Sequence, residues 1–305
     1  MRLLAAALAA LGFATAACGQ APAALGLLEL ASDTDGFHAS RYRAGGLYPY
    51  ASWFDNAGVA AQTTHYSQGD WSRDAHAVLG IWRSQAPATL AGVNAEAGVV
   101  QVAGHTRGIG DVTWGLRPAP DTGVELIAAG DLVATQKAID RAIAYGFFAA
   151  SVEQTFAERF TAIGLVGWQP FTDGNDRLHL RARLIWQAVP DYGINLQARW
   201  RQYDSRKDDV EGAYFNPDRY RQWQAVVAFR RRFGSWVWLG GVGAGRETIN
   251  GTDTHPVRMA EIRGEGALTE KLRLAWHASY NRSTGYVDAP EYAYREAGVT
   301  LIYAF

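Results

Sequence analysis

The sequence RLHLRARLIW occupies residues 177–186 and places an apolar side chain at every even position. The first four odd positions are basic: Arg177, His179, Arg181 and Arg183. Side chains that repeat with a period of two lie on opposite faces of a β-strand. The stretch therefore predicts a strand with one apolar face and one cationic face.

The same alternation returns in residues 194–203, 222–230 and 272–281. These segments are longer than the five or six residues of an ordinary soluble strand, and about ten residues suffice for a tilted strand to cross a membrane. Turn-forming residues separate the segments at 118–123, 173–176, 189–191 and 250–253. We expect Leu196 to face lipid near the mid-depth of the membrane, and residues 203–218 and 281–291 to form outer loops.

The spacing predicts about ten strands from Val124 to Phe305 and about six between Gly26 and Pro118. The predicted fold is all-β, a transmembrane antiparallel up-and-down β-barrel of about 16 strands that occupies residues 24–305 as one domain. Counts of about 14 or 18 strands also fit the length.

The chain ends on a strand whose odd positions are apolar or aromatic: Val299, Leu301, Tyr303 and Phe305. This ending resembles the assembly signal by which the barrel-assembly machinery recognises outer-membrane proteins. A last strand of this kind pairs with the first strand and leaves no open edge. We therefore expect a bacterial outer-membrane location, with membrane lipid and the assembly machinery as partners.

The first residues have the order of a secretory signal peptide, with a basic start at Met1-Arg2, an apolar run from Leu3 to Phe13 and small residues after it. We assign residues 1–17 to this signal. Cys18 is the only cysteine. Its position suits lipidation at a lipoprotein cleavage site, and the sequence leaves open ordinary cleavage after Ala16 or Ala23.

Composition narrows the classes of function. The 11 Trp and 14 Tyr are many for a soluble domain and suit the two membrane interfaces. A near balance of 29 basic and 30 acidic residues argues against a nucleic-acid partner. The seven histidines show no metal-binding spacing, and the pair His277 and Ser279 is only a weak catalytic signal. We expect no enzyme activity, no metal and no cofactor.

Polar faces of the predicted strands turn inward if the apolar faces meet lipid. A cationic wall on neighbouring strands, with acidic and basic partners on a later strand, then lines the lumen. The predicted path for a substrate comprises Arg177, Arg181, Arg183, Arg199, Arg201, Tyr203, Glu261, Arg263 and Glu265. Such charges can brace opposite walls, and together with aromatic rings they can also guide a sugar-like solute.

The stretch Ala213 to Tyr220, AYFNPDRY, precedes a long strand that ends in Arg230-Arg231-Arg232-Phe233. This pair resembles the carboxyl-terminal barrels of exopolysaccharide export porins, of the cellulose and poly-N-acetylglucosamine systems, and YaiO-type outer-membrane barrels. The resemblance covers about residues 110–305 and implies a passive channel for export of a polysaccharide chain.

The export porins carry a periplasmic helical array that this chain lacks, so the resemblance implies a separate periplasmic scaffold and an inner-membrane synthase as partners. A role in biofilm formation follows from the same resemblance. The alternatives are a general small-solute porin and a non-conducting surface barrel that serves as an adhesin, receptor or assembly partner.

Overall fold

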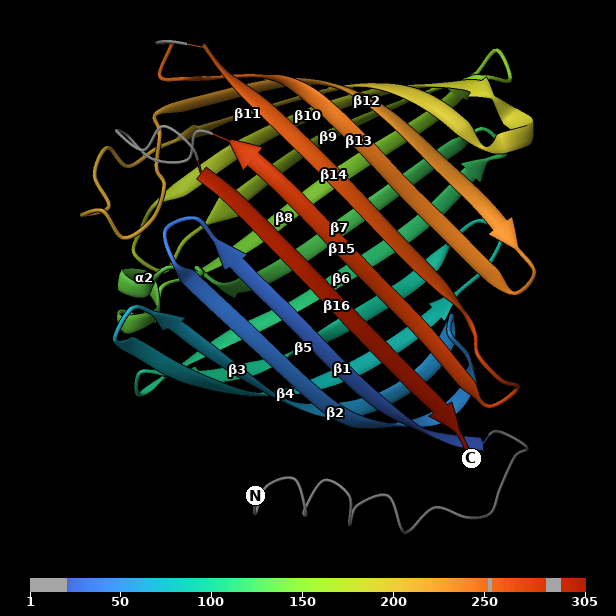
Figure 1. The fold of residues 1–305 in the computed structure, drawn as a ribbon, viewed down its shortest axis with the longest axis horizontal. Coiled ribbons are helices and arrows are strands. Elements are labelled where there is room, and N and C mark those ends of the chain that lie inside the picture. The colour runs from blue at the N-terminus through green and yellow to red at the C-terminus, as the bar shows by residue number, and fades with distance from the viewer. Residues whose placement is uncertain (1–20, 252–253, 284–291) are drawn as a thin grey trace.

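A computed structural model describes residues 21–251, 254–283 and 292–305, which form one closed antiparallel barrel. Each of its 16 strands pairs with its neighbours in sequence, and β1 pairs with β16 to complete the circle (Figure 1). The predicted signal peptide and Cys18 lie outside the described residues. The predicted fold class is confirmed.

The strand bounds agree with the predicted count, with six strands before residue 120 and ten from residue 122 onward. The first strand starts at Ala21, ahead of the predicted domain start at residue 24. The elements are β1 (Ala21–Asp33), β2 (Phe37–Ser52), β3 (Asp55–Gln68), β4 (Trp71–Gln85), β5 (Gly92–Val102), β6 (His105–Ala119), β7 (Thr122–Leu132), α2 (Gln136–Asp140), β8 (Ala144–Phe156), β9 (Phe160–Pro170), β10 (Asp176–Val189), η2 (Pro190–Tyr192), β11 (Ile194–Ser205), β12 (Arg219–Phe233), β13 (Trp236–Ile249), β14 (Thr254–Ala267), β15 (Leu272–Ser283) and β16 (Tyr292–Ala304).

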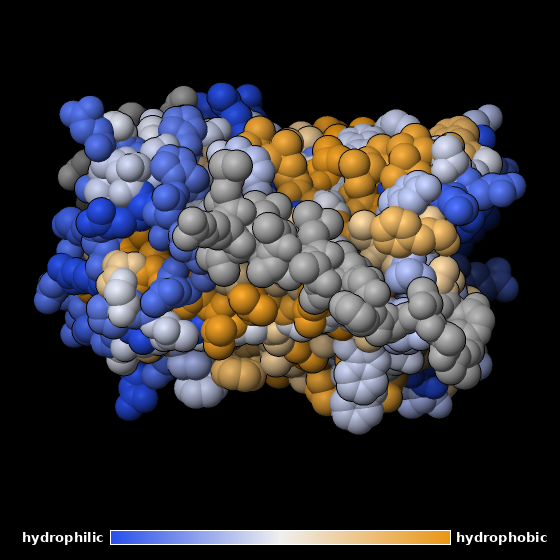
Figure 2. Space-filling model, turned by 90° about the horizontal axis from the view of Figure 1, so that it is seen from below, coloured by the Kyte–Doolittle hydropathy of each residue, from blue (hydrophilic) through white to orange (hydrophobic). Residues whose placement is uncertain are grey.

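The outward face of the barrel is apolar. On β10 the outward side chains are exposed and include Leu178 and Leu184, whereas Arg177 and His179 turn inward and are buried. Figure 2 shows the result as a hydrophobic band between two hydrophilic ends. An outward apolar band on a closed barrel is the feature that holds such a protein in the outer membrane, and this chain is an outer-membrane barrel.

No helix in the described part of the chain is long and apolar enough to cross a membrane.

Closure depends on β1 and β16, which pair from Ala23 opposite Ala304 to Asp33 opposite Tyr294. The predicted stripe Val299, Leu301, Tyr303 and Phe305 is exposed on the outward face, with each side chain at least 41% accessible. These side chains therefore meet lipid while the backbone of the same strand completes the hydrogen-bonded circle.

The two ends of the barrel differ in their connections. The end that holds Ala21 and Phe305 has short turns, such as residues 120–121 and 234–235. The opposite end carries the longer segments, including residues 133–143, which contain α2, and residues 206–218. Outer-membrane barrels have short periplasmic turns and longer extracellular loops. We therefore refer to the end with Ala21 and Phe305 as the periplasmic end and to the other as the outer end.

Part of the interior is apolar, which the alternation did not predict. Under the outer end, the inward side chains of β2 to β7 pack on the segment around α2, with Leu79, Val100 and Ile139 all buried. Near the periplasmic end, Leu25, Leu47 and other buried side chains form a second cluster with Ile302. The inward face is therefore polar on one side of the barrel and partly apolar on the other.

The apolar band generates a depth-dependent prediction. Val242 is 61% exposed at the middle of β13, whereas Leu196 lies only two residues from the periplasmic start of β11, so its expected mid-depth position is wrong. We expect Val242→Arg to lower the free energy of unfolding by about 2–4 kcal/mol and Leu196→Arg by about 0–1 kcal/mol. Equilibrium unfolding in lipid vesicles measures both values.

Ser279→Arg is the matched control, because Ser279 lies near the middle of β15 and faces the lumen opposite Glu261. We expect this variant to remain close to the wild-type stability. Equal losses for Val242→Arg and Ser279→Arg would contradict the assignment of inside and outside.

Candidate functional site

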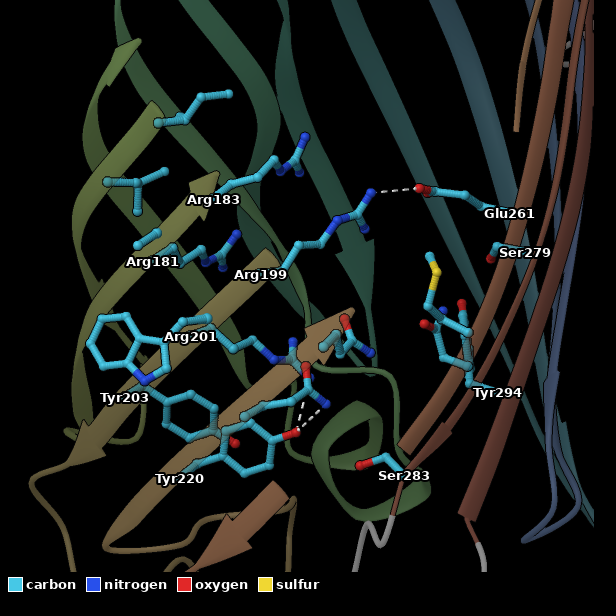
Figure 3. A pocket seen from close by; sticks show the side chains of 18 of the residues that line it. Arg181, Arg183, Arg199, Arg201, Tyr203, Tyr220, Glu261, Ser279, Ser283 and Tyr294 are labelled. Atoms are coloured by element: carbon cyan, nitrogen blue, oxygen red, sulfur yellow. Dashed lines mark hydrogen bonds and ion pairs between the residues drawn. The ribbon is translucent and has the colours of Figure 1, made fainter. Parts of the chain in front are cut away.

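A cavity of about 780 Å³ lies inside the barrel, between the walls formed by β7 to β12 and β14 to β16 (Figure 3). Its lining is rich in arginine, tyrosine and amide side chains. The inward-facing polar residues among them are Glu125, Ser151, Arg181, Arg183, Arg199, Arg201, Tyr203, Tyr220, Gln222, Gln224, Glu261, Ser279, Asn281, Ser283, Tyr292 and Tyr294.

Four arginines form the cationic part of the wall, which we call the arginine block: Arg181, Arg183, Arg199 and Arg201. The register of β10 and β11 sets Arg181 directly opposite Arg201, and Arg183 directly opposite Arg199. Like charges directly opposite each other destabilise a sheet. The arginine block therefore has an unfavourable arrangement unless anionic or hydrogen-bond-accepting groups come close.

Within the described residues, the arginine block has one carboxylate partner. Arg199 forms an ion pair of 3.2 Å with Glu261, across two intervening strands. Arg201 donates to the hydroxyl of Tyr220 over 3.0 Å, and the Arg181 guanidinium lies over the ring of Phe147. Neither Arg181 nor Arg183 forms an ion pair with a described residue. Their charge therefore remains available to the cavity.

Tyr220 connects the arginine block to a buried carboxylate. Its hydroxyl donates to Glu247 over 2.6 Å and accepts from Gln222 over 2.9 Å. Glu247 is 1% exposed and also accepts from the hydroxyl of Ser283 over 2.6 Å. Buried carboxylates require such donors. The network fixes the orientation of Tyr220 at the outer part of the cavity.

Arg177, a predicted path residue, is buried and does not line this cavity. Its guanidinium lies over the rings of Phe171, Tyr203 and Tyr214 at 4.9, 5.1 and 5.4 Å, and it donates to the backbone carbonyl of Phe215. The residue therefore fastens the segment 206–218 to the barrel wall.

Asn175 fastens the same segment from the neighbouring loop. Its amide nitrogen donates to the Tyr214 hydroxyl over 3.0 Å and to Asn216 over 2.8 Å, and its carbonyl accepts from the backbone N–H of Lys207 over 3.0 Å. Burial raises the pKa of Tyr214 to about 12, so its hydroxyl stays protonated and donates to Asp173 over 2.9 Å.

Two outer segments meet across the mouth, and we call them together the outer cap: residues 133–143 and 206–218. Thr135 is the N-cap of α2 and donates its hydroxyl to the carbonyl of Ala213 over 2.5 Å, while Arg141 pairs with Glu211 over 2.8 Å. Ala138 and Tyr214 share a buried apolar cluster. The outer cap therefore covers part of the outer opening above the cavity.

The opposite wall is braced by ion pairs. Arg41 binds Glu29 over 2.9 Å and Asp131 over 3.1 Å, which joins β2 to β7 across the interior. Arg43 and Arg83 both bind Glu96, at 2.5 and 2.7 Å. The predicted bracing by charged pairs is therefore found on the wall formed by β1 to β7. The arginine block and the cavity lie toward the opposite wall.

His277 lies between two carboxylates on the inner wall. Its Nε2 is 2.9 Å from Glu296 and 4.0 Å from Glu29, and these three side chains could present ligand atoms within 4.8 Å of one another. The carboxylates already accept from Arg41 and Tyr294. We interpret the cluster as a further brace. Ser279 lines the cavity instead of bonding to His277.

The structure thus brings six predicted path residues to the cavity: Arg181, Arg183, Arg199, Arg201, Tyr203 and Glu261. Arg263 and Glu265 lie opposite His277 and Ala275, nearer the periplasmic end, and do not line it. Tyr220 and Glu247 were not among the predicted path residues. The even-numbered polar series of β12, which includes Gln222 and Gln224, extends to Tyr220 and could have identified it.

A second, smaller cavity of about 70 Å³ lies near the periplasmic turn of residues 86–91. It shares Glu125, Ser151 and Ile163 with the large cavity. The two cavities therefore adjoin along the inner faces of β7 to β9, in the direction of the periplasmic end.

The Tyr220 network generates a stability prediction. Tyr220→Phe removes a donor to buried Glu247 and an acceptor for Arg201, so we expect it to lower the free energy of unfolding by about 1–3 kcal/mol. Tyr192→Phe is the control, because Tyr192 is 57% exposed in the η2 turn. Unfolding in detergent micelles compares the two, and equal stability would show that the network does not hold the wall.

No protein-family model matches this chain. No curated protein matches it in sequence. Among solved structures, it is similar to a protein described as a bacterial polysaccharide outer membrane secretin, with a TM-score of 0.65, 13% identity, and coverage of 95% of this chain and 100% of the other.

A second solved structure is OprD, an outer membrane protein of Pseudomonas aeruginosa. It has a TM-score of 0.45 and 11% identity, and the match covers 94% of each chain. At 13% identity the match to the polysaccharide secretin shows the fold alone, and this chain is a 16-strand barrel of the outer-membrane type.

Proposed function

We propose that this barrel is an outer-membrane channel through which an exopolysaccharide leaves the cell. The observation that carries the proposal is the arginine block facing a cavity of about 780 Å³ within a closed transmembrane barrel. A wall made only to brace the barrel would pair these charges with carboxylates, as the opposite wall does.

The chemistry of the lining suits a sugar chain. Guanidinium groups and side-chain amides donate hydrogen bonds to hydroxyl and carboxylate oxygens, and aromatic rings stack on the apolar faces of sugars. Tyr203 and Tyr220 stack on each other at 4.9 Å beside Arg201, so rings and donors lie together. The adjoining small cavity supports continuation of the path toward the periplasm.

The similarity to the polysaccharide secretin supports the proposal through shared architecture only, since identity is 13%. On this proposal the partners are the polysaccharide chain, a separate periplasmic scaffold and an inner-membrane synthase. The outer cap would have to shift aside for a polymer to pass, because Phe215 of the cap borders the cavity.

A general small-solute porin is the second candidate. It is favoured by the free charge of Arg181 and Arg183, which would attract small anions without any need for a polymer. A non-conducting surface barrel is favoured by the outer cap and by the packed interior of β2 to β7. Conductance separates this last candidate from the two channels.

Charge selectivity tests the role of the arginine block. Wild-type protein in a planar lipid bilayer under a KCl gradient is expected to prefer chloride, and Arg181→Gln/Arg183→Gln is expected to move the reversal potential toward cation selectivity, because two luminal charges are removed. Arg231→Gln is the control, since Arg231 lies over Tyr192 and Phe233 near the periplasmic end of β12. An unchanged reversal potential in the double variant would place the arginine block outside the conducting path.

Blocking by sugar polymers then separates export from general permeation. Polygalacturonate and dextran, added on the periplasmic side, are expected to interrupt the wild-type current, with the double variant less sensitive to the anionic polymer. A current that neither polymer interrupts would favour the small-solute porin over the export channel.

A further inference from the structure

The outer surface of the barrel carries a row of five arginines on consecutive strands, which we call the outer arginine row. Its members are Arg221 of β12, Arg246 of β13, Arg258 of β14, Arg282 of β15 and Arg295 of β16. Each arginine lies either an even number of positions from an exposed outward residue of its own strand, or directly opposite an outward residue of the neighbouring strand. The five side chains therefore share the outward face with the side chains of Trp223, Val242 and Val299.

The register makes this row continuous. Arg258 is directly opposite Arg282. Arg246 is directly opposite Pro256, and Arg258 lies two residues after Pro256 on the same strand. Arg295 is directly opposite Tyr280, and Arg282 lies two residues after Tyr280 on the same strand. Diagonal neighbours of this kind are about 7–8 Å apart, and neighbouring strands are about 4.8 Å apart. Three diagonal steps in the same direction and one direct step therefore spread the five cations over about 27 Å of the barrel wall.

No carboxylate shares this face on the described residues of β12 to β16. The acidic side chains of these strands alternate inward: Glu247, Glu261, Glu265 and Glu296. Within the described residues, Arg246, Arg258 and Arg295 have no ion pair or hydrogen bond, and all three are exposed. Adjacent like charges repel each other, so an external anion with several charges would stabilise this surface.

The depth of the row indicates where that anion lies. Every member is within four residues of the outer end of its strand, and Trp223 and Tyr280 lie one step closer to the middle. Aromatic side chains of this kind mark the membrane interface. The row therefore lies at the level of the headgroups of the outer leaflet, above the apolar band.

The row is confined to one sector of the barrel. At the same level on β3 and β4, His65 faces Asp74 at 2.7 Å, and Asp204 at the edge of β11 already binds Arg219 at 2.6 Å. A general preference for positive charge at the outer interface would not produce this confinement.

We propose that the outer arginine row is a binding site for the phosphate groups of a glycolipid of the outer leaflet, lipopolysaccharide. Guanidinium groups bind phosphate oxygens in a bidentate geometry, and several phosphates on one headgroup match several adjacent arginines. The acyl chains of the same lipid would lie on the apolar side chains below the row, so one molecule would meet both surfaces. Arg258 and Arg282 also border the luminal cavity, and the side chains of the row lie on the face of their strands opposite to the luminal side chains.

The test uses the full-length protein in phosphatidylcholine vesicles that contain lipopolysaccharide, with native mass spectrometry of the extracted complex to measure binding. Arg246→Gln/Arg258→Gln/Arg295→Gln is expected to weaken binding about a hundredfold, since each basic residue near an anionic surface contributes roughly fivefold. The corresponding Arg→Lys triple variant keeps the charge and is expected to retain most of the binding. Dephosphorylated lipopolysaccharide is expected to bind the wild type as weakly as phosphorylated lipopolysaccharide binds the Gln triple variant.

Arg181→Gln/Arg183→Gln/Arg199→Gln is the matched control, because it removes the same charge from the lumen and is expected to leave lipid binding unchanged. Equal binding of phosphorylated and dephosphorylated lipid, or wild-type binding by the outward triple variant, would overturn the proposal. Displacement by millimolar inorganic phosphate would also overturn it in favour of a free-phosphate site. Equal competition by soluble polygalacturonate would assign the row to an acidic polysaccharide.

Discussion

Pairing between the first and the last strand is the interaction on which the rest of this barrel depends. Along β1 and β16 the backbone groups bond to each other, so no edge is left in a membrane that offers no water to satisfy it. Closure also determines which face of each strand points to lipid and which face points to the lumen. Once Val299, Leu301 and Tyr303 point to lipid, the register around the circle determines which side chain of every other strand points inward.

The interior that closure creates is divided. On the side of β1 to β7, apolar clusters and the ion pairs of Arg41, Arg43 and Arg83 hold the wall. On the side of β7 to β12 and β14 to β16, the arginine block faces a cavity, and Glu261 is its one described carboxylate partner. On our proposal, stability and solute binding therefore belong to different sectors, so that a braced wall and a polar path occur in the same barrel.

The outward face shows a similar division of roles. Its middle is apolar and interacts with acyl chains, while the outer arginine row of β12 to β16 interacts with headgroups on our proposal. Because the same strands carry luminal side chains at alternate positions, each of them contributes to the cavity and to the lipid surface at once. Substitutions at neighbouring positions of one strand should therefore affect different properties of the protein.

Much of the fold followed from the sequence because period-two alternation is a local property. It predicted the strand count, the faces of β10 and β11, and the outward stripe that ends at Phe305. Contacts between distant segments were not predictable in this way. The bond from Arg41 to Asp131 and the burial of Arg177 under residues 206–218 depend on tertiary structure, and the inward apolar side chains Leu79 and Val100 contradict the rule that luminal faces are polar.

The most direct test of the divided interior is the access of a membrane-impermeant thiol reagent to single cysteines introduced into a background without Cys18. Ser279→Cys lines the cavity, and Gln62→Cys lies at a position that is 7% exposed in the braced half. Our account predicts that methanethiosulfonate added from the aqueous phase modifies the first cysteine rapidly and lowers the conductance, while the second reacts slowly and leaves the current unchanged. Equal modification rates at the two positions would contradict it.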